Sequence, residues 1–549
     1  MLVIVATGLL AAVFFWQVST LKKSVVHESQ ILEALLTPKQ IFSKVLFSPL
    51  RKIPGPFIAK ITSKWLTMVD MAGDRTSAIH KLHQKYGSTV RIGPREISYS
   101  NAEVINEIYS QQTPYMKAPI YETFSLPPIG IFSLRDKTEH SQRRRLLSHA
   151  FSQASLLGTE PLIKDLVGKL IAHIERGRGR PLDALLLFRL VSFDIVGELF
   201  LGQSFGGLDL DAPKPPQFLK DMDYQFILSG LEANLPGLHW ILALLRTRIP
   251  SVDHFLGARH RIHENKTRPV YTWYEYRLTF FRGSESKYGE YAFNQYIEQH
   301  GRNSGRKDLL TKILTTKSND STTMMMTDRE TCAEVGNMVF AGTDTTSTTL
   351  TYLFYELARN PSWQTRLRTE LARIPHDSLD GQLPNYTSLS DLPILDAVIN
   401  EALRLHPAAP ASLQRVVPPG GKVLNGTFVP EGTVVSAQCY TTQRDPVAFP
   451  DPEMFLPSRW MDTDLEKKTK EPSVTSLFMP FSHGTRACIG KNLAMMELKL
   501  ITASVVRRFK VEIAPGNTED SMLMKDHFLA IPKSGKCDLI FRDVSDYQL

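Results

Sequence analysis

The sequence predicts a mainly α-helical protein, in which one large helical domain carries a small β-rich region and follows a single membrane-anchoring helix. Three observations support this prediction. Apolar residues recur at helical spacing through most of the chain. Two short segments, 89–100 and 426–438, alternate apolar and polar residues between turn-forming residues, as β-strands do. The N-terminal segment carries no charged side chain before Lys22.

The N-terminal segment, residues 1–21, is about as long as the ~20 residues that a membrane-spanning helix needs. A cleaved signal peptide is the alternative, but the segment lacks a basic start and a clear cleavage site. Lysines follow the apolar run, which places the rest of the chain in the cytosol. We therefore expect an uncleaved anchor at 1–21, a linker along the membrane surface at 22–53, and a folded domain at 54–549, after the prolines of KIPGPF.

Cysteine spacing and charge exclude several classes of protein. The four cysteines lie far apart without a C-x-x-C pair, which argues against zinc ribbons, disulfide frameworks and covalently attached haem. The net charge of +8 comes with no nucleic-acid-binding motif, so we expect no nucleic-acid partner. A basic surface suits an anionic membrane or an acidic protein.

A long helix is predicted over residues 331–360, and its middle, AGTDTTSTT, is unusual. A glycine and five threonines stand where leucine or alanine would favour the helix more. Threonines that bond back to carbonyls four residues earlier would explain one or two of them. A buried carboxylate at Asp344 is costly without a purpose. We interpret Gly342 as leaving space for a small ligand, and Asp344 and Thr345 as proton-delivering residues.

A second helix is predicted in DLPILDAVINEALRLHP, residues 391–407. Glu401 and Arg404 are three residues apart and share one face of it. An exposed ion pair is the ordinary interpretation of this spacing. The flanking residues are strongly apolar, however, so we expect a buried pair that needs further partners. Arg459, in FLPSRW, is the candidate third member.

The third feature is Cys488, within PFSHGTRACIGKN at residues 480–492. Gly484 permits a tight turn, and Gly490 allows the helix that follows to approach a large flat ligand. The start of that helix and the nearby Arg486 both favour a thiolate over a thiol. Such a thiolate can bind a soft metal ion or haem iron.

In this order the motifs resemble those of the cytochrome P450 family, the haem-thiolate monooxygenases. AGTDTT resembles the family's oxygen-activating helix motif, EALR its E-x-x-R motif, and FSHGTRACIG fits F-x-x-G-x-R-x-C-x-G at every fixed position. FLPSRW resembles the family's P-E-R-F/W segment, with Ser458 in place of the glutamate. The resemblance extends from Pro54 to Cys537.

The resemblance implies the cytochrome P450 fold, with haem between the oxygen-binding helix and the cysteine loop. Cys488 would be the axial ligand of a non-covalent haem b. The remaining expected cofactor-binding residues are Phe481, Gly484, Arg486 and Gly490 around the cysteine, and His140, Arg144 and Arg415 at the propionates. Arg143 and Arg145, beside Arg144, are expected to form a solvated basic face.

The resemblance also implies the roles of the other residues. Asp344 and Thr345 would deliver protons during oxygen activation, whereas Glu401, Arg404 and Arg459 would hold the fold around the haem. Substrate contacts are expected from the loop before the His140 helix, from the oxygen-binding helix and from the segment after His406: Tyr121, Phe124, Phe132, Phe340, Ala341 and Ala411.

The expected activity is oxidation of an apolar small molecule with O2. The chain has no flavin or nicotinamide fingerprint, so electrons would come from NADPH through a separate cytochrome P450 reductase, with cytochrome b5 as an additional donor. The expected location is the endoplasmic reticulum membrane. Several stretches, including FPDPEMFLPSRW, are similar to filamentous-fungal members of secondary metabolism. The alternatives are a haem-thiolate isomerase or dehydratase, and a non-enzymatic haem-binding membrane protein; neither would need the Asp344–Thr345 pair.

Overall fold

The computed structural model describes residues 45–124, 128–209, 249–257, 285–315, 325–380, 383–461 and 472–544, and the single positions 219, 224, 228 and 242. The predicted anchor at 1–21 lies outside the described residues. Within them, no helix has both the length and the apolar character needed to cross a membrane. Leu50 and Ile53, at the end of the predicted linker, are buried in a core cluster, so the folded domain already includes them.

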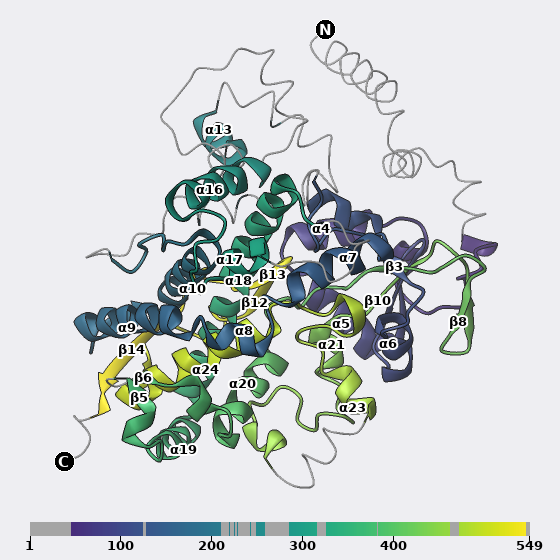
Figure 1. Ribbon diagram of the computed structural model, residues 1–549. Helices are drawn as coiled ribbons and strands as arrows, with labels where there is room; N and C mark the ends of the chain where they lie inside the picture. The colour runs from purple at the N-terminus through teal and green to yellow at the C-terminus, as the bar shows by residue number, and fades with distance from the viewer. Residues whose placement is uncertain are drawn as a thin grey trace.

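The described chain is mainly helical, with small sheets, as predicted. The largest helices pack together on the left of Figure 1, and the main sheet lies on the right. The central helices are α9 (Glu160–Gly177), α10 (Ala184–Leu201), α18 (Asp328–Arg359), α20 (Pro393–Leu405) and α24 (Lys491–Arg508). The others are α4 (Lys64–Met71), α5 (Arg75–Tyr86), α6 (Ala102–Tyr109), α7 (Lys137–Ser148), α8 (Gln153–Leu157), α13 (Pro250–Leu256), α16 (Glu285–His300), α17 (Leu309–Thr315), α19 (Pro361–Leu371), α21 (Cys439–Thr442) and α23 (Pro472–Leu477).

The longest helix, α18, begins at a capping box in which the Thr327 side chain accepts from the Glu330 N–H while the Glu330 carboxylate accepts from the Thr327 N–H. Its threonine-rich middle is stabilised more by back-bonding than the sequence suggested. The hydroxyls of Thr343, Thr345 and Thr349 each donate to the carbonyl four residues earlier, at 2.7, 2.7 and 3.0 Å. These bonds satisfy the hydroxyl groups inside the protein.

The five-stranded sheet has the order β1-β2-β10-β7-β3 and joins segments far apart in the chain. Its strands are β1 (Thr89–Gly93), β2 (Glu96–Tyr99), β3 (Met116–Lys117), β7 (Arg415–Val416) and β10 (Val434–Ser436). The predicted segment 89–100 forms the hairpin β1–β2, and 426–438 contains β9 and β10. β10 pairs with β2 in parallel and with β7 in antiparallel, which brings residue 415 next to residue 117 through β7 and β3.

Four smaller sheets complete the β structure. They are β11-β14-β4 (Phe509–Ile513, Asp538–Asp543, Pro181–Asp183), β12-β13 (Met524–His527, Leu529–Pro532), β5-β6 (Leu379–Asp380, Leu383–Pro384) and β8-β9 (Lys422–Leu424, Thr427–Val429). The hairpin β12–β13 is attached to the helical core, because the Thr348 hydroxyl of α18 donates to the Ala530 carbonyl. This attachment places the hairpin tip against the cavity described below.

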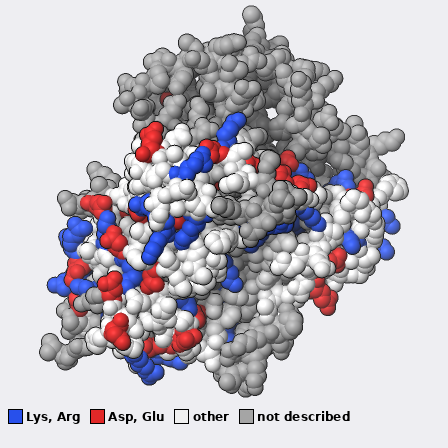
Figure 2. Space-filling view, in the orientation of Figure 1, with Lys and Arg blue, Asp and Glu red and all other residues white. Residues whose placement is uncertain are grey.

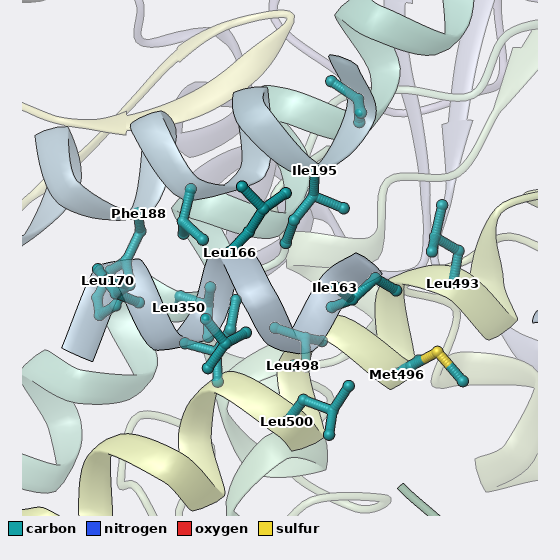
Figure 3. Close-up of a cluster of buried hydrophobic side chains, with 14 of the residues drawn as sticks. Ile163, Leu166, Leu170, Phe188, Ile195, Leu350, Leu493, Met496, Leu498 and Leu500 are labelled. Atoms are coloured by element: carbon teal, nitrogen blue, oxygen red, sulfur yellow. The ribbon is translucent and has the colours of Figure 1, made fainter. Parts of the chain in front are cut away.

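The main core lies between α9, α10, α18 and α24, whose apolar side chains point toward one another in Figure 3. Leu170 and Leu350 are fully buried there, together with Phe188, whose ring stacks on Phe354. On the face shown in Figure 2, basic and acidic side chains lie interspersed. The core therefore fixes α18 and α24, the two helices next to the predicted haem site.

Candidate functional site

A cavity of about 370 Å³ lies between α18 and the loop that carries Cys488. Side chains from α7, from strands β3 and β7 and from the tip of the β12–β13 hairpin close its other sides. The Cys488 thiol is exposed, and the surface it exposes faces this cavity. The structure therefore brings the predicted cysteine loop and the predicted oxygen-binding helix to one enclosed space.

The loop around Cys488 is held by backbone contacts. Gly484 has φ +67°, and a Cβ there would lie 2.1 Å from the Tyr109 carbonyl oxygen, so only glycine fits. The Cys488 N–H donates to the Phe481 carbonyl at 2.9 Å. Gly490, the N-cap of α24, lines the cavity, with only the Cys488 sulfur, 3.9 Å away, near its Cβ position. These findings confirm the tight turn at Gly484, although Gly484 does not line the cavity. The approach of the helix to a flat ligand at Gly490 stays a prediction.

Burial raises the pKa of the Cys488 thiol, while backbone N–H groups at the start of α24 and the Arg144 and Lys491 charges oppose that rise. The predicted influence of Arg486 on the sulfur is not found. Its guanidinium instead donates to the Leu134 carbonyl at 2.6 Å, in the segment before α7. A metal cation bound to the sulfur would keep it ionised despite burial.

Four cationic side chains line the cavity wall beside α7, and none of them forms an ion pair with a described residue. They are Lys117, Arg144, Arg415 and Arg486. Lys117 and Arg415 are buried, and Arg415 donates to a backbone carbonyl, that of Gln414, at 2.9 Å. Burial and the four cations lower the pKa of His140 to about 3, so this imidazole is neutral at physiological pH. Such a concentration of positive charge requires an anion.

The site fits haem, because a sulfur, apolar walls and a group of unpaired cations are what a haem needs for its iron, macrocycle and propionates. His140, Arg144, Arg415, Arg486 and Phe481 all line the cavity, as predicted. Lys117 was not predicted. Its position became evident only from the pairing of β3 with β7, which places it beside Arg415.

On the α18 side, the two predicted proton-delivering residues point in different directions. Thr345 lines the cavity, whereas Asp344 lies outside the lining and pairs with Arg189 of α10, Nε to Oδ1 2.9 Å. The interpretation of Gly342 was incomplete. Its backbone lines the cavity, but a Cβ there would lie 2.5 Å from Val196, so the missing side chain serves the close packing of α10 on α18.

Most of the predicted substrate contacts line the same cavity. Tyr121, Phe124, Phe132, Phe340 and Ala341 all do so. Ala411 does not, and its neighbours Ala408 and Ala409 take its place. Asn337 and Phe528 also line the cavity and were missed, because an asparagine in a helix and a phenylalanine in a hairpin carry no distinguishing sequence signal.

The buried network around Glu401 was predicted in part. Glu401 and Arg404 form a bidentate pair with both distances 2.9 Å, and both side chains are fully buried. Arg459 donates to Glu401 at 3.2 Å, as predicted. The Trp460 indole N–H at 3.0 Å and the Leu456 N–H at 2.9 Å complete the set of donors.

Arg143 and Arg145 were both predicted to be solvated. This prediction was correct for Arg145, which is exposed, and wrong for Arg143, which is buried. Arg143 pairs with Glu334 at 2.8 Å and with Glu330, both on α18. The Glu334 carboxylate also accepts from the Ile131 N–H at 2.8 Å. α7 and the loop before it are therefore fixed to the first turns of α18.

Comparison with known proteins agrees with this site. The sequence model of the family described as cytochrome P450 matches residues 54–539. The chain is 32% identical over 502 residues to the cytochrome P450 monooxygenase tazI of Aspergillus terreus, a match that covers 90% of this chain and 94% of the relative. It is 31% identical to FCK2 of Fusarium pseudograminearum (85% and 77% covered) and 30% identical to aflV of Aspergillus parasiticus (91% and 92% covered), both also cytochrome P450 monooxygenases. The chain belongs to the cytochrome P450 family and is a haem-thiolate monooxygenase.

Proposed function

We propose that this protein oxidises an apolar small molecule at a haem held by Cys488, in a fungal secondary-metabolite pathway. The observation that carries the proposal is one cavity, lined by the Cys488 thiol, four cations that have no ion pair among the described residues, and mostly apolar side chains. The haem, when bound through a thiolate, supplies reductive activation of O2 and insertion of one oxygen atom into the substrate. Everything else in the reaction depends on how this chain positions groups around it.

Each side chain has a role in this proposal. Cys488 would bind the haem iron, while Arg144, Arg415 and Arg486, together with Lys117, would neutralise the haem propionates. Thr345, whose hydroxyl donates to the Ala341 carbonyl at 2.7 Å and lines the cavity, hands protons to the reacting oxygen. Asp344 replenishes them from the α10 side of the helix, where Arg189 holds it.

Electrons come from NADPH through a separate reductase, with cytochrome b5 as an additional donor, and the chain is anchored in the endoplasmic reticulum membrane by residues 1–21, with the domain in the cytosol. The support for the anchor is the uncharged N-terminal run followed by lysines. The support for an apolar substrate is the aromatic and aliphatic lining of the cavity. Immunolocalisation of the full chain, compared with a chain lacking residues 1–21, tests the anchor.

The test of the haem role is the reduced carbon monoxide difference spectrum of the full chain and of Cys488→Ala. We expect the thiolate signature in the first and its loss in the second. The test of proton delivery is Thr345→Val, which keeps the shape and removes the hydroxyl; we expect NADPH consumption to continue while hydrogen peroxide replaces product. Coupled product formation by Thr345→Val would contradict the role of Thr345.

A haem-thiolate isomerase or dehydratase, the alternative that the sequence left open, would share the same haem-thiolate site. The Thr345 hydroxyl at the cavity wall favours the monooxygenase, since an isomerase needs no protons for O2 activation. Omission of the reductase separates the two: monooxygenase turnover stops, and isomerase turnover continues.

A further inference from the structure

Four aromatic rings form one wall of the cavity, on the side that the cysteine loop does not reach. Phe528 lies 4.8 Å from Phe124 and 5.7 Å from Phe132, between ring centroids, and Tyr121 lies 5.5 Å from Phe132. All four rings line the cavity. We call Tyr121, Phe124, Phe132 and Phe528 the aromatic wall. Rings at these separations form a continuous apolar surface. The Lys117 ammonium lies over two of them, 4.5 Å from the Tyr121 centroid and 4.4 Å from the Phe132 centroid, so we assign the contact with a flat, conjugated ligand to Phe124 and Phe528.

Phe528 reaches this wall through an unfavourable backbone conformation. Its φ is +81°, in the region that residues with a bulky side chain rarely adopt. The Asp526 carboxylate holds the turn, because it accepts from the Phe528 N–H at 2.9 Å and from the Thr76 hydroxyl. Strain of this kind persists where the surroundings impose it, and it is common at ligand sites. The turn thus serves to place the Phe528 ring in the cavity.

One neutral polar side chain of α18 lines the same cavity as the aromatic wall. Of the α18 residues that line the cavity before Thr345, which are Asn337, Met338, Phe340, Ala341 and Gly342, only Asn337 is polar. Its side-chain amide forms no hydrogen bond with any described residue. An amide offers both donors and an acceptor, so the group is free to bind either a carbonyl or a hydroxyl oxygen.

The Asn337 amide lies against a glycine. A Cβ on Gly130 would lie 1.7 Å from the Asn337 nitrogen, so the amide occupies the space that any other residue would fill. The loop is fixed there by the bond from the Ile131 N–H to Glu334, one turn before Asn337 on α18. The glycine therefore leaves the amide the room that it occupies beside this loop.

Asn337, Ala341 and Thr345 follow one another at four-residue steps and form a stripe along α18. Eight residues of helix span ~12 Å, which separates the Asn337 amide from the Thr345 hydroxyl along the helix axis. If Thr345 marks the oxygen-activating end, as proposed above, the amide marks the opposite end of the substrate space. The cations of the cavity lie beside α7, where they would neutralise the haem propionates, and the Lys117 ammonium also donates to the Phe132 carbonyl in the aromatic wall.

We propose that Asn337 binds a carbonyl or hydroxyl oxygen of the substrate, while the aromatic wall packs on its flat conjugated body. The substrate is then an elongated, conjugated, neutral molecule, oxidised at a carbon that lies about eight helical residues, or ~12 Å, from that oxygen. This inference rests on the proposed function, because Thr345 defines the reacting end. It extends that function by naming the substrate class and two residues that select it.

The test uses the haem-loaded full chain and two probes of matched shape, 2-acetylanthracene and 2-ethylanthracene. Binding is measured by anthracene fluorescence and, separately, by the shift of the haem absorption band. We expect the wild type to bind the acetyl probe about tenfold more tightly, the effect of one net hydrogen bond. Asn337→Leu should bring the two dissociation constants within about twofold. Equal binding of both probes by the wild type, or binding of neither, would overturn the proposal.

Two further variants separate the hydrogen bond from the wall. Gly130→Ala retains Asn337 but displaces its amide, so we expect the same loss of preference. Phe528→Leu should weaken the binding of both probes several-fold and leave the ratio of their dissociation constants unchanged. Asn303→Leu, the same change on an exposed loop, is the control. A preference that survives in both Asn337→Leu and Gly130→Ala would show that another group binds the oxygen.

Folding and the haem role are checked independently of this result. Haem content and thermal midpoint identify a variant that does not fold, in which case Asn337→Ala replaces Asn337→Leu. The fluorescence titration does not depend on the haem spectrum. A missing thiolate signature with intact probe preference would therefore contradict the proposed function, whereas a normal signature without preference would contradict only the assignment of Asn337.

Discussion

Two groups of buried charge lie in the same domain and differ in how their charges are satisfied. Glu401 accepts from Arg404, Arg459, Trp460 and the Leu456 N–H, and Arg404 donates further to the Gln443, Pro452 and Met454 carbonyls. Among the described residues, the cavity cations, which are Lys117, Arg144, Arg415 and Arg486, have no carboxylate partner. The first group is complete within the protein, and the second is complete only with an anionic ligand.

The difference gives a way to tell structural charge from binding charge. A buried ion pair with all its hydrogen bonds made fixes geometry, but removal of one partner leaves an uncompensated charge. In a group of like charges without a counter-ion, the free protein already bears the energetic cost of uncompensated buried charge, and an anionic ligand removes that cost. Variants of the two groups should therefore affect different measurements.

The largest expected effect is on the complete group. Glu401→Ala leaves Arg404 and Arg459 buried without a counter-charge, so we expect a loss of about 3–5 kcal/mol of unfolding free energy, or failure to accumulate folded protein. Denaturant unfolding measures it, with the exposed Glu298→Ala on α16 as the control, expected within about 0.5 kcal/mol. If Glu401→Ala lost haem but kept the unfolding free energy of the wild type, the Glu401 network would behave like the cavity cations, and the distinction between the two groups would fail.

The second expected effect concerns a buried acid on the cavity wall that belongs to neither group. Burial raises the pKa of Glu497 to about 8, and the opposing contribution is a hydrogen bond from Thr346. In the unfolded chain the pKa is about 4.3. The folded protein thus holds this proton to higher pH than the unfolded chain does, so stability falls as pH rises between about 4 and 8.

Glu497→Gln removes that fall, because the amide does not ionise. We expect the variant and the wild type to have similar unfolding free energies near pH 4, and the variant to gain on the order of 3 kcal/mol by pH 8. Thermal midpoints of the variant and the wild type, measured across this pH range, give the difference in stability. If this difference in stability did not change with pH, Glu497 would be ionised in the folded protein and would help to neutralise the cavity cations.

The smallest expected effect is on the incomplete group. Arg415→Leu removes one unpaired buried cation, so we expect the haem-free protein to be as stable as the wild type or slightly more stable. Haem should dissociate about tenfold faster, the effect of one charged hydrogen bond. Transfer of haem to an excess of apomyoglobin measures the rate, with the exposed Arg145→Leu as control. A destabilised apoprotein would show that Arg415 belongs to the structural scaffold.

The sequence predicted the parts of the site that are local in the chain. Cys488, Gly484 and Gly490 lie in one loop, and Glu401 and Arg404 lie on one helical turn, so their spacing indicates their geometry. The helices predicted over 331–360 and 391–407, and the helix predicted after Cys488, correspond to α18, α20 and α24, because periodicity along a helix is also local.

The features that sequence reasoning missed depend on contacts between distant segments. Lys117 enters the cavity through a strand pairing with residue 415, and Arg189 meets Asp344 across two packed helices. Arg143 was assigned to solvent because its partners, Glu330 and Glu334, lie almost 200 residues away in the chain. Gly342 was interpreted from its own helix alone, without knowledge that Val196 would pack against it.

The contacts of Arg486 have a consequence for the order of folding. Its guanidinium joins the cysteine loop to the carbonyl of Leu134, 352 residues earlier, and Gly484 presses on the carbonyl of Tyr109. This junction can close only after residue 486 has left the ribosome, long after the segment around residue 134. Contacts of such long range form slowly and late. The cysteine loop therefore meets its partners near residues 109 and 134 late in folding, and we expect the haem pocket to be among the last parts of the domain to be completed.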